Sequence, residues 1–281
     1  MTEAGKLYDP SRLIVVRGGG DIATGTIWKL RRCGFPVLVL ETQRPTAIRR
    51  NVAFCEAVSQ GSQTIEGMTC RLARDIPEAE AMLSGCGLAM LIDPEAACLS
   101  HFHPLALVDA ILAKKNLGTN RSMCPITVAL GPGFVAGVDV DAVIETNRGH
   151  RLGRVILDGP AEADTGVPGM IKGYGRERVL HSPATGTLRQ LSHITDTVTQ
   201  GQVIAEIQTP DGVVPVTATL SGLLRGLIAD GFPVWKGLKI ADIDPRTDEY
   251  QNCFTISDKA RCIAGGVLEA ILYLHSRSEQ S

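Results

Sequence analysis

The sequence feature that most constrains the fold is an apolar run at residues 13–16 that is followed at once by a cluster of glycines. The run is rich in β-branched residues and has no polar interruption, which is typical of a strand buried on both faces of a parallel sheet. Gly18, Gly20 and Ala23 then match the pattern G-x-G-x-x-G/A, whose small residues permit a tight turn and close approach of a phosphate to the backbone. A helix expected over residues 21–33 would point its N-terminal N–H groups at that phosphate.

A second apolar run, at residues 37–40, ends in Glu41, which stands 21 residues past Gly20. In dinucleotide-binding folds a carboxylate at this place accepts hydrogen bonds from ribose hydroxyls. Two residues depart from the usual pattern, since Arg17 precedes the glycines and Asp21 follows them. An aspartate beside a pyrophosphate is unfavourable unless it caps the helix or binds a hydroxyl, so a glycine turn without a ligand stays an alternative.

Further apolar runs continue this alternation. Strands are expected at residues 88–92, 126–130 and 151–157, with a helix at residues 105–115 between the first two. The order predicts a Rossmann-like α/β domain over residues 1–177, built on a right-handed, doubly wound parallel sheet.

Ligands of such sheets bind outside the carboxyl ends of the strands, so the residues that follow each run are candidate site residues. Asp93 follows one run, although Asp-Pro is also an ordinary turn. A second glycine turn follows the next run, and a polar segment rich in groups that bind or transfer protons comes after it. The residues concerned are Gly131, Pro132, Gly133 and Phe134 in the turn, and Glu145, Arg148 and His150 in the polar segment.

Arginines that follow Glu41 are candidates for binding an oxyanion, because a guanidinium offers paired donors in one plane. Pro45 and Thr46 form a helix-entry signal that would aim Arg49 or Arg50 along the ligand crevice. The alternative is a solvated start of a helix.

Charge and cysteine usage exclude several classes of protein. The formal net charge is -2, which gives no basic footprint for nucleic acid, and no apolar run or leader pattern points to a membrane. The eight cysteines show no C-x-x-C spacing, which argues against a zinc site and a disulfide framework. His101 and His103 are expected in a surface loop rather than around a metal. We therefore expect a cytoplasmic protein without a metal site, and a homo-oligomer stays open.

The texture of the sequence changes after residue 178, where one segment repeats. Residues 186–207 recur with an offset of 36 at residues 222–243, with nine identities and with Glu206 matched by Asp242. Two intertwined copies predict a small closed β-barrel with pseudo-twofold symmetry over residues 178–247. The segment resembles a lipoyl/biotinyl hammerhead, but the hairpin between its halves lacks the lysine that such carriers modify. A docking or rigidifying role is expected instead.

The last predicted domain, residues 248–281, contains an amphipathic helix at residues 258–272. Gly265 and Gly266 lie in its middle and cost about 1 kcal/mol each relative to alanine. Close packing would offset that cost, so we expect the helix to return to the first domain.

Taken whole, the chain resembles the selenium-dependent molybdenum hydroxylase system proteins, a bacterial accessory family tied to molybdenum cofactor maturation. The matching motifs lie in order along the chain, at residues 18–25, 41–50, 92–94, 113–116, 131–134, 144–150 and 258–260. The resemblance implies a protein that binds a molybdopterin dinucleotide, or another nucleotide, between the two glycine turns and helps to install sulfur or selenium on molybdenum. Its partners would be a molybdenum hydroxylase or other cofactor-maturation enzymes, and Cys55 or Cys98 would be candidate chalcogen carriers.

Two other functions stay open, an NAD-dependent oxidoreductase and a non-enzymatic scaffold that docks a hydroxylase through the barrel. Neither a Tyr-x-x-x-Lys motif nor a His/Asp catalytic pair supports the oxidoreductase. The candidate catalytic residues are Asp93, Glu145 and His150. The candidate cofactor-binding residues are Gly18, Gly19, Gly20, Asp21, Ala23, Thr24, Glu41, Arg49, Arg50, Asp93, Gly131, Pro132, Gly133, Phe134 and Arg148.

Overall fold

The computed structural model describes residues 9–166 and 169–278, which form two compact units. The first unit contains the chain up to Pro45, Ala53–Asp164 and the segment from Ile256. The second unit contains Thr46–Val52 and Thr165–Thr255. Residues 46–52 and 165–177, which the sequence places with the first domain, therefore group with the second unit.

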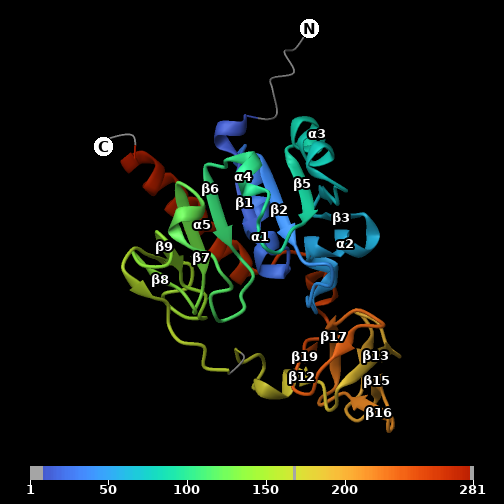
Figure 1. Ribbon diagram of the computed structural model, residues 1–281. Coiled ribbons are helices and arrows are strands. Elements are labelled where there is room, and N and C mark those ends of the chain that lie inside the picture. The colour runs from blue at the N-terminus through green and yellow to red at the C-terminus, as the bar shows by residue number, and fades with distance from the viewer. Residues whose placement is uncertain (1–8, 167–168, 279–281) are drawn as a thin grey trace. The chain divides into compact units, whose positions relative to one another are not determined.

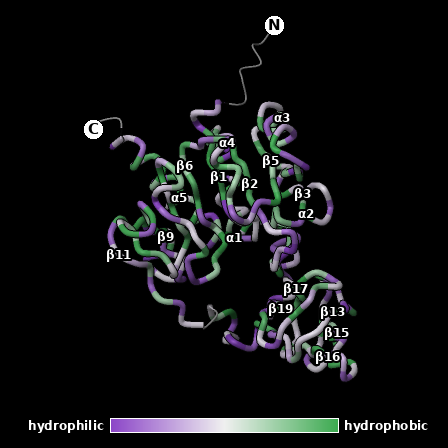
Figure 2. The backbone as a smooth tube through the Cα atoms, in the orientation of Figure 1, coloured by the Kyte–Doolittle hydropathy of each residue, from purple (hydrophilic) through white to green (hydrophobic). Residues whose placement is uncertain are grey.

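The first unit is built on a seven-stranded sheet with the order β10-β9-β7-β6-β1-β2-β5 (Figure 1). The first six of these strands in chain order run parallel, and the last pairs antiparallel to β9. The hydrophobic residues of the unit concentrate along the strands of this sheet, as Figure 2 shows for β1, β2 and the edge strand β5. The strands are β1 (Ile14–Arg17), β2 (Val37–Glu41), β5 (Leu88–Ile92), β6 (Ala106–Asp109), β7 (Ile126–Leu130), β9 (Ala142–Ile144) and β10 (Val155–Ile156).

Two helices of the first unit, α1 (Asp21–Arg32) and α5 (Asp258–Ser278), pack against each other. Gly25 makes this possible, because a Cβ there would lie only 2.8 Å from the Cβ of Ala260. Gly266 of α5 likewise meets the backbone of Gly153. No helix in the described part of the chain is long and apolar enough to cross a membrane.

Smaller elements surround this framework. They are α2 (Ala57–Gln60), α3 (Ile76–Cys86), α4 (Leu99–Phe102), the hairpin of β3 (Ser62–Ile65) and β4 (Met68–Arg71), and the pair β8 (Val135–Ala136) and β11 (Gly159–Pro160). Short 3-10 turns lie at Pro10–Arg12, Arg50–Val52, Phe54–Glu56, Arg121–Met123, Arg176–Arg178 and Tyr250–Cys253.

The predicted doubly wound parallel sheet is wrong in two respects. The sheet is mixed, because β10 runs antiparallel to β9. Helices also do not alternate regularly with the strands, since a loop and a 3-10 turn connect β6 to β7 and the short strand β8 lies between β7 and β9. The helix predicted at residues 105–115 is strand β6 followed by a loop. The apolar residues of this segment fit both the helical and the strand pattern. Parallel pairing of β6 with β1 and β7 stabilises the strand.

The second unit consists of two four-stranded antiparallel sheets, with the orders β12-β19-β17-β14 and β16-β15-β13-β18. Both sheets contribute to one hydrophobic core. The strands are β12 (Val179–His181), β13 (Gly186–Gln190), β14 (Thr197–Val198), β15 (Val203–Thr209), β16 (Gly212–Thr217), β17 (Gly222–Leu227), β18 (Pro233–Val234) and β19 (Lys239–Asp244). The offset of 36 maps β13 onto β17, β14 onto β18 and β15 onto β19, so each sheet takes strands from both copies.

The predicted hammerhead-like closed barrel is corrected accordingly. Among the strands that the structure describes, no ladder joins the two sheets. The edge strands β14 and β18 have only two residues each, and Pro233 of β18 has no N–H to donate. The two sheets are therefore held together by side-chain packing rather than by closure of a ladder.

Candidate functional site

Of the three glycines that follow β1, two must be glycine because a side chain would collide with neighbouring backbone, and the third need not be. Gly18 has φ +94°, and a Cβ there would lie 3.0 Å from the carbonyl oxygen of Ala110. A Cβ at Gly19 would lie 3.0 Å from the amide nitrogen of Cys55. Gly20, at the N-terminus of α1, has an ordinary backbone conformation and no described atom within 4 Å of an added Cβ. Only the missing side chain of Gly20 leaves open space.

Glu41 lies at the carboxyl end of β2, where the sequence predicts a ligand-binding carboxylate. Its Oε2 accepts a hydrogen bond from the amide of Gly19 at 2.8 Å, and its Oε1 accepts one from the amide of Thr42 at 2.8 Å. Burial raises the pKa of the Glu41 carboxyl, against the opposing effect of these two amides and of a hydrogen bond from the Thr42 side chain. A carboxylate can accept about four hydrogen bonds, so it retains capacity for another donor. The amide of Gly19, however, is no longer available to a pyrophosphate.

A pocket of about 360 Å³, which we call the glycine pocket, opens at this edge of the sheet. Most of its wall is apolar, and Ile111 and Leu117 are 37% and 44% exposed there. The lining residues are Arg17, Gly18, Leu40, Glu41, Thr42, Pro94, Glu95, Ile111 and Leu117. Exposed apolar side chains beside a buried carboxylate are typical of a small-molecule site.

Arg17 is locked into a buried network behind this pocket. Its Nη1 donates to Thr119 Oγ1, and that hydroxyl donates in turn to Asp109 Oδ2 at 2.6 Å. Its Nη2 donates to the carbonyl of Pro94 at 2.6 Å, and an ion pair of 3.7 Å joins its Nη1 to Asp109. Burial raises the pKa of Asp109, which Thr119, an amide and Arg17 partly offset. Asp109 therefore balances the charge of Arg17, and the carboxylates Glu41 and Glu95 are left to set the charge of the pocket.

The sequence analysis missed this network. It noted Arg17 only as a departure from the glycine pattern and placed Asp109 within a helix. The available signal was the position of Asp109 directly after the buried apolar residues 106–108, which is where the carboxyl end of a strand would fall.

Other predicted site residues have structural roles. Asp93 accepts hydrogen bonds from the amides of Ala97 and Cys98, at 3.0 and 2.8 Å, and so stabilises the turn that leads into α4. Ala23 and Thr24 are buried in α1, where the Thr24 hydroxyl donates to the Gly20 carbonyl at 2.9 Å. Asp21 is the first residue of that helix.

Packing also explains the second glycine turn. Gly131 and Gly133 have φ values of +74° and +109°, and added Cβ atoms would meet Thr146 and the backbone of Lys115. Phe134 is buried in a small apolar cluster, and Pro132 is partly exposed between the glycines. None of these four residues lines the glycine pocket.

The arginines predicted to bind a pyrophosphate are engaged elsewhere. Arg148 pairs with Asp258 through two bonds of 2.7 and 3.1 Å, and this hydrogen-bonding raises the pKa of Arg148. Arg49 and Arg50 belong to the second unit, where Arg49 donates to the carbonyl of Asn252 at 3.1 Å.

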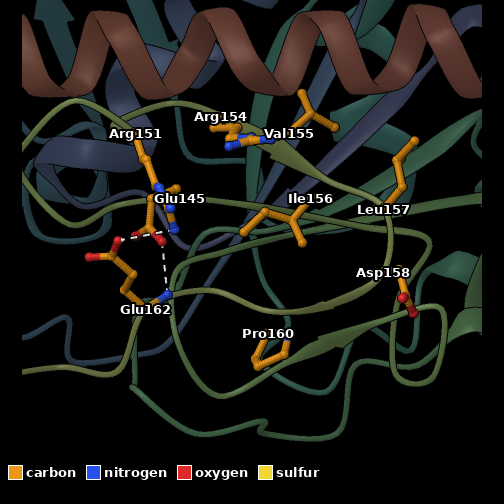
Figure 3. Close-up of a pocket in the computed structure, with 9 residues that line it drawn as sticks. All are labelled: Glu145, Arg151, Arg154, Val155, Ile156, Leu157, Asp158, Pro160 and Glu162. Carbon is orange, nitrogen blue, oxygen red and sulfur yellow. Dashed lines mark hydrogen bonds and ion pairs between the residues drawn. The ribbon is translucent and has the colours of Figure 1, made fainter.

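Glu145 lies in a second pocket, of about 320 Å³, shown in Figure 3. Its two oxygens accept hydrogen bonds from the amides of Asn147 and Glu162, at 2.6 and 2.8 Å, and Glu162 also pairs with Arg151 at 3.8 Å. His150 is exposed and does not line this pocket. Four strands separate the end of β9 from the end of β5, a span of roughly 24 Å. The three candidate catalytic residues Asp93, Glu145 and His150 are therefore not brought together.

The two candidate chalcogen carriers are unsuited to that role. Burial raises the pKa of the Cys55 thiol well above its usual value and that of Cys98 to about 12. A reactive cysteine needs an accessible thiolate instead. His101 contacts Glu80 at 2.9 Å, and within the described residues no group of three or more His, Cys, Asp or Glu side chains could hold a metal ion.

No known family model matches the chain. The chain is 49% identical over 263 residues to the protein described as "Uncharacterized protein YqeB" of Escherichia coli (strain K12). The match covers 94% of this chain and 48% of that protein, so the chain spans about half the length of the curated relative it matches.

Solved structures give only distant likenesses. An aspartoacylase family protein from Mesorhizobium loti is 12% identical, with coverage of 84% and 85% and a TM-score of 0.26. The ectoine utilization protein EutE (DoeB) from Ruegeria pomeroyi is 10% identical, with coverage of 83% and 86% and a TM-score of 0.27. A succinylglutamate desuccinylase/aspartoacylase from Rhodobacter sphaeroides is 10% identical, with coverage of 85% and 86% and a TM-score of 0.29. These TM-scores transfer neither a fold nor an activity to this chain.

None of the relatives and solved structures named above is described as a protein of a molybdenum or selenium system, and no family model matches. The predicted membership of the selenium-dependent molybdenum hydroxylase system family is therefore wrong, and the predicted function in molybdenum cofactor maturation falls with it. Two of the matching motifs, the glycine turns, have packing reasons inside the first unit. The oxidoreductase and hydroxylase-scaffold alternatives gain no support either. A nucleotide ligand and a homo-oligomer stay predictions that neither the structure nor the comparisons test.

Proposed function

We propose that the first unit binds a small uncharged molecule that carries neighbouring hydroxyl groups and a flat apolar part, of the ribonucleoside class, in the glycine pocket. The observation that carries the proposal is the Glu41 carboxylate, which is buried at an apolar pocket and holds acceptor capacity beyond its two backbone donors. Two hydroxyls on adjacent carbons match the two oxygens of one carboxylate.

The walls of the pocket suit the rest of such a ligand. Pro94, Ile111 and Leu117 offer apolar surface to a flat ring, and a volume of about 360 Å³ lies in the range of small-molecule sites. Arg17 is neutralised by Asp109, so the pocket presents the negative charges of its carboxylates. A phosphate inside the pocket would be repelled, and an uncharged ligand is favoured.

Calorimetric titration with adenosine, guanosine, cytidine and 2′-deoxyadenosine tests the proposal. Loss of one hydroxyl donor to a charged acceptor should weaken binding of the deoxynucleoside about tenfold relative to adenosine. Glu41→Gln should abolish this discrimination, because the amide presents only one acceptor oxygen. Leu117→Ser should weaken every ligand, whereas Leu191→Ser, a leucine of similar exposure in the second unit, should change nothing.

Two further ligands define the extent of the site. AMP and NAD should bind no more tightly than adenosine if the phosphate lies outside the pocket. Gly20→Val places its Cβ in the open space before α1, with no described atom within 4 Å, so it should affect mainly ligands whose phosphate extends there. Absence of binding by all of these ligands, or equal affinities in wild type and Glu41→Gln, would overturn the proposal.

The eight cysteines, all of them free thiols, support the further proposal that the protein works in the reducing environment of the cytoplasm. Fractionation of cells that express the protein, followed by thiol titration of the cytoplasmic fraction, tests it. Recovery in an oxidising compartment would contradict it.

A further inference from the structure

A third pocket of the first unit is rich in arginine and has no carboxylate in its lining. It has a volume of about 500 Å³ and lies where the end of α1, the hairpin β3–β4 and the turn from α3 into β5 meet. Three guanidinium groups, those of Arg31, Arg32 and Arg71, share its wall with the apolar side chains of Met68 and Leu88. We call it the arginine pocket.

Two of these arginines are held in place by the fold. Arg31 donates to the carbonyls of Phe35 and Cys86, at 2.9 and 3.0 Å, and Gly87 makes room because a Cβ there would lie 2.7 Å from the guanidinium carbon. Arg32 lies over the ring of Trp28, with 5.1 Å between its guanidinium carbon and the ring centroid. Their positions also suit the negative C-terminal end of α1.

Arg32 and Arg71 are both exposed, and the side chain of Arg71 forms no hydrogen bond or ion pair with any residue that the structure describes. The two acidic side chains nearest in sequence have other partners. Asp75 accepts a hydrogen bond from the amide of Glu78 at 2.9 Å, and Glu66 pairs with Arg261, whose Nη2 lies 2.6 Å from both carboxylate oxygens. The three cations of the pocket therefore repel one another without a local counter-charge.

We propose that the arginine pocket binds a small organic anion, one that presents a carboxylate or phosphate group to the guanidinium groups and an apolar part to the partly buried Met68. Guanidinium donors match the planar or tetrahedral oxygens of both groups, and Arg31 is already oriented by its backbone contacts. The site is independent of the proposed nucleoside site, because the two pockets share no lining residue. Along β5 they are separated by the strand, roughly 13 Å.

Cys86 supplies a direct reporter, since it is an exposed thiol in the lining of this pocket. In a Cys33→Ser/Cys262→Ser background it becomes the one exposed cysteine among the six that remain. The rate at which uncharged iodoacetamide alkylates Cys86 is measured against the concentration of inorganic phosphate and, separately, of succinate, at constant ionic strength set with sodium chloride. We expect saturable protection of at least about threefold by one or both anions.

Arg71→Gln should raise the anion concentration needed for half-protection about tenfold, because one charge-assisted contact is lost. Arg74→Gln is the matched control: Arg74 is also exposed but pairs with Glu78 at 2.8 Å and does not line the pocket. The ratio of phosphate to succinate affinity identifies the preferred group. Protection equal to that given by sodium chloride alone, or identical responses of Arg71→Gln and Arg74→Gln, would overturn the proposal.

Discussion

The two copies of the 36-residue repeat in the second unit have the same backbone design and different electrostatic surroundings. Gly186 of β13 and Gly222 of β17 hold equivalent positions, and added Cβ atoms would overlap the carbonyl oxygens of Gln208 and Asp244 respectively. Those two partners are themselves 36 residues apart. The repeat therefore preserves a close crossing of two strands in each copy.

The charged pair of the repeat behaves differently in each copy. In the first copy Arg189 and Glu206 form an ion pair of 3.6 Å, with side chains 64% and 27% exposed. Their equivalents Arg225 and Asp242 have side chains only 13% and 9% exposed. Asp242 pairs with Arg178 at 3.0 Å, a residue outside the repeat. Arg225 pairs with Asp244 at 3.4 Å. The same sequence pattern thus gives one solvated pair in the first copy, whereas in the second copy both residues are buried and pair with other partners.

The segment Thr46–Val52, which belongs to the second unit, contacts the second copy. The carbonyl of Ile48 accepts a hydrogen bond from the amide of Leu227 at 2.8 Å. Gly226 permits this approach, because a Cβ there would lie 3.1 Å from the same carbonyl oxygen. The equivalent residue of the first copy is Gln190. The second copy therefore has a glycine at the position that Ile48 approaches, whereas the first copy has a glutamine there.

The largest expected effect comes from the buried pair. Asp242→Asn leaves the Arg178 guanidinium buried without its counter-charge and should lower the free energy of unfolding of the second unit by about 3–5 kcal/mol. Glu206→Gln removes an exposed charge and should cost about 1 kcal/mol or less. Urea unfolding in a Trp28→Phe background follows the second unit through Trp235, the remaining tryptophan. Equal losses in the two variants would show that the copies do not differ in this way.

The next effect tests what the copies share. Gly186→Ala and Gly222→Ala each force a methyl group against a backbone carbonyl, so each should cost about 3 kcal/mol in the same assay. The two losses should be similar, because the added methyl group meets an equivalent backbone carbonyl in each copy. Gly201→Ala is unsuitable as a control because its φ is +85°, whereas Leu191→Ala, at an exposed site, serves that purpose. If only one of the two positions tolerated alanine, Gly186 and Gly222 would not be structurally equivalent.

A smaller effect is expected where the covering segment approaches. Gly226→Ala should cost about 1–2 kcal/mol, because the backbone at Ile48 must shift by a few tenths of an ångström. Gln190→Ala, at the equivalent place of the first copy, removes a side-chain hydrogen bond to the carbonyl of Ile228 and should cost about 1 kcal/mol. Hydrogen exchange of the Leu227 amide should accelerate in Gly226→Ala and stay unchanged in Gln190→Ala. Unchanged exchange in both variants would contradict the role given to residues 46–52.

The sequence alone predicts local features of this molecule well and their surroundings poorly. The apolar runs at residues 13–16, 37–40, 88–92 and 126–130 coincide with β1, β2, β5 and β7 to within a residue, and the repeat offset matches equivalent strands. Those signals depend on residues close together in the chain. The strand β6, by contrast, was predicted as a helix because only its neighbours in the sheet distinguish the two.

The candidate site follows the same division. The position of Glu41 at the end of β2 was predictable from its distance to the glycines, but its hydrogen bond to Gly19 was not. The partners of Arg17, at Pro94, Asp109 and Thr119, come from three other segments of the chain. Motif spacing carries no information about such partners, which is why it suggested a phosphate site and a family that the comparisons do not support.

The smallest expected effect is an acid response that belongs to the second copy alone. Burial raises the pKa of Asp244, but hydrogen bonds and the charge of Arg246 outweigh it, so the pKa lies below its usual value. The folded state then binds fewer protons than the unfolded state, and the stability contributed by Asp244 is present above pH 4 and lost as the pH falls below it. The equivalent residue of the first copy, Gln208, does not titrate.

In the Trp28→Phe background, the difference in unfolding free energy between the parent and Asp244→Asn should therefore shrink, by up to about 1 kcal/mol, between pH 6 and pH 3. The control is Gln208→Glu, which introduces an acid at the equivalent place of the first copy, where no counterpart of Arg246 lies beside it. The difference in unfolding free energy between the parent and Gln208→Glu should stay unchanged over this range. A difference that grows as the pH falls would mean that Asp244 is held in its neutral form, and that burial rather than Arg246 sets its charge.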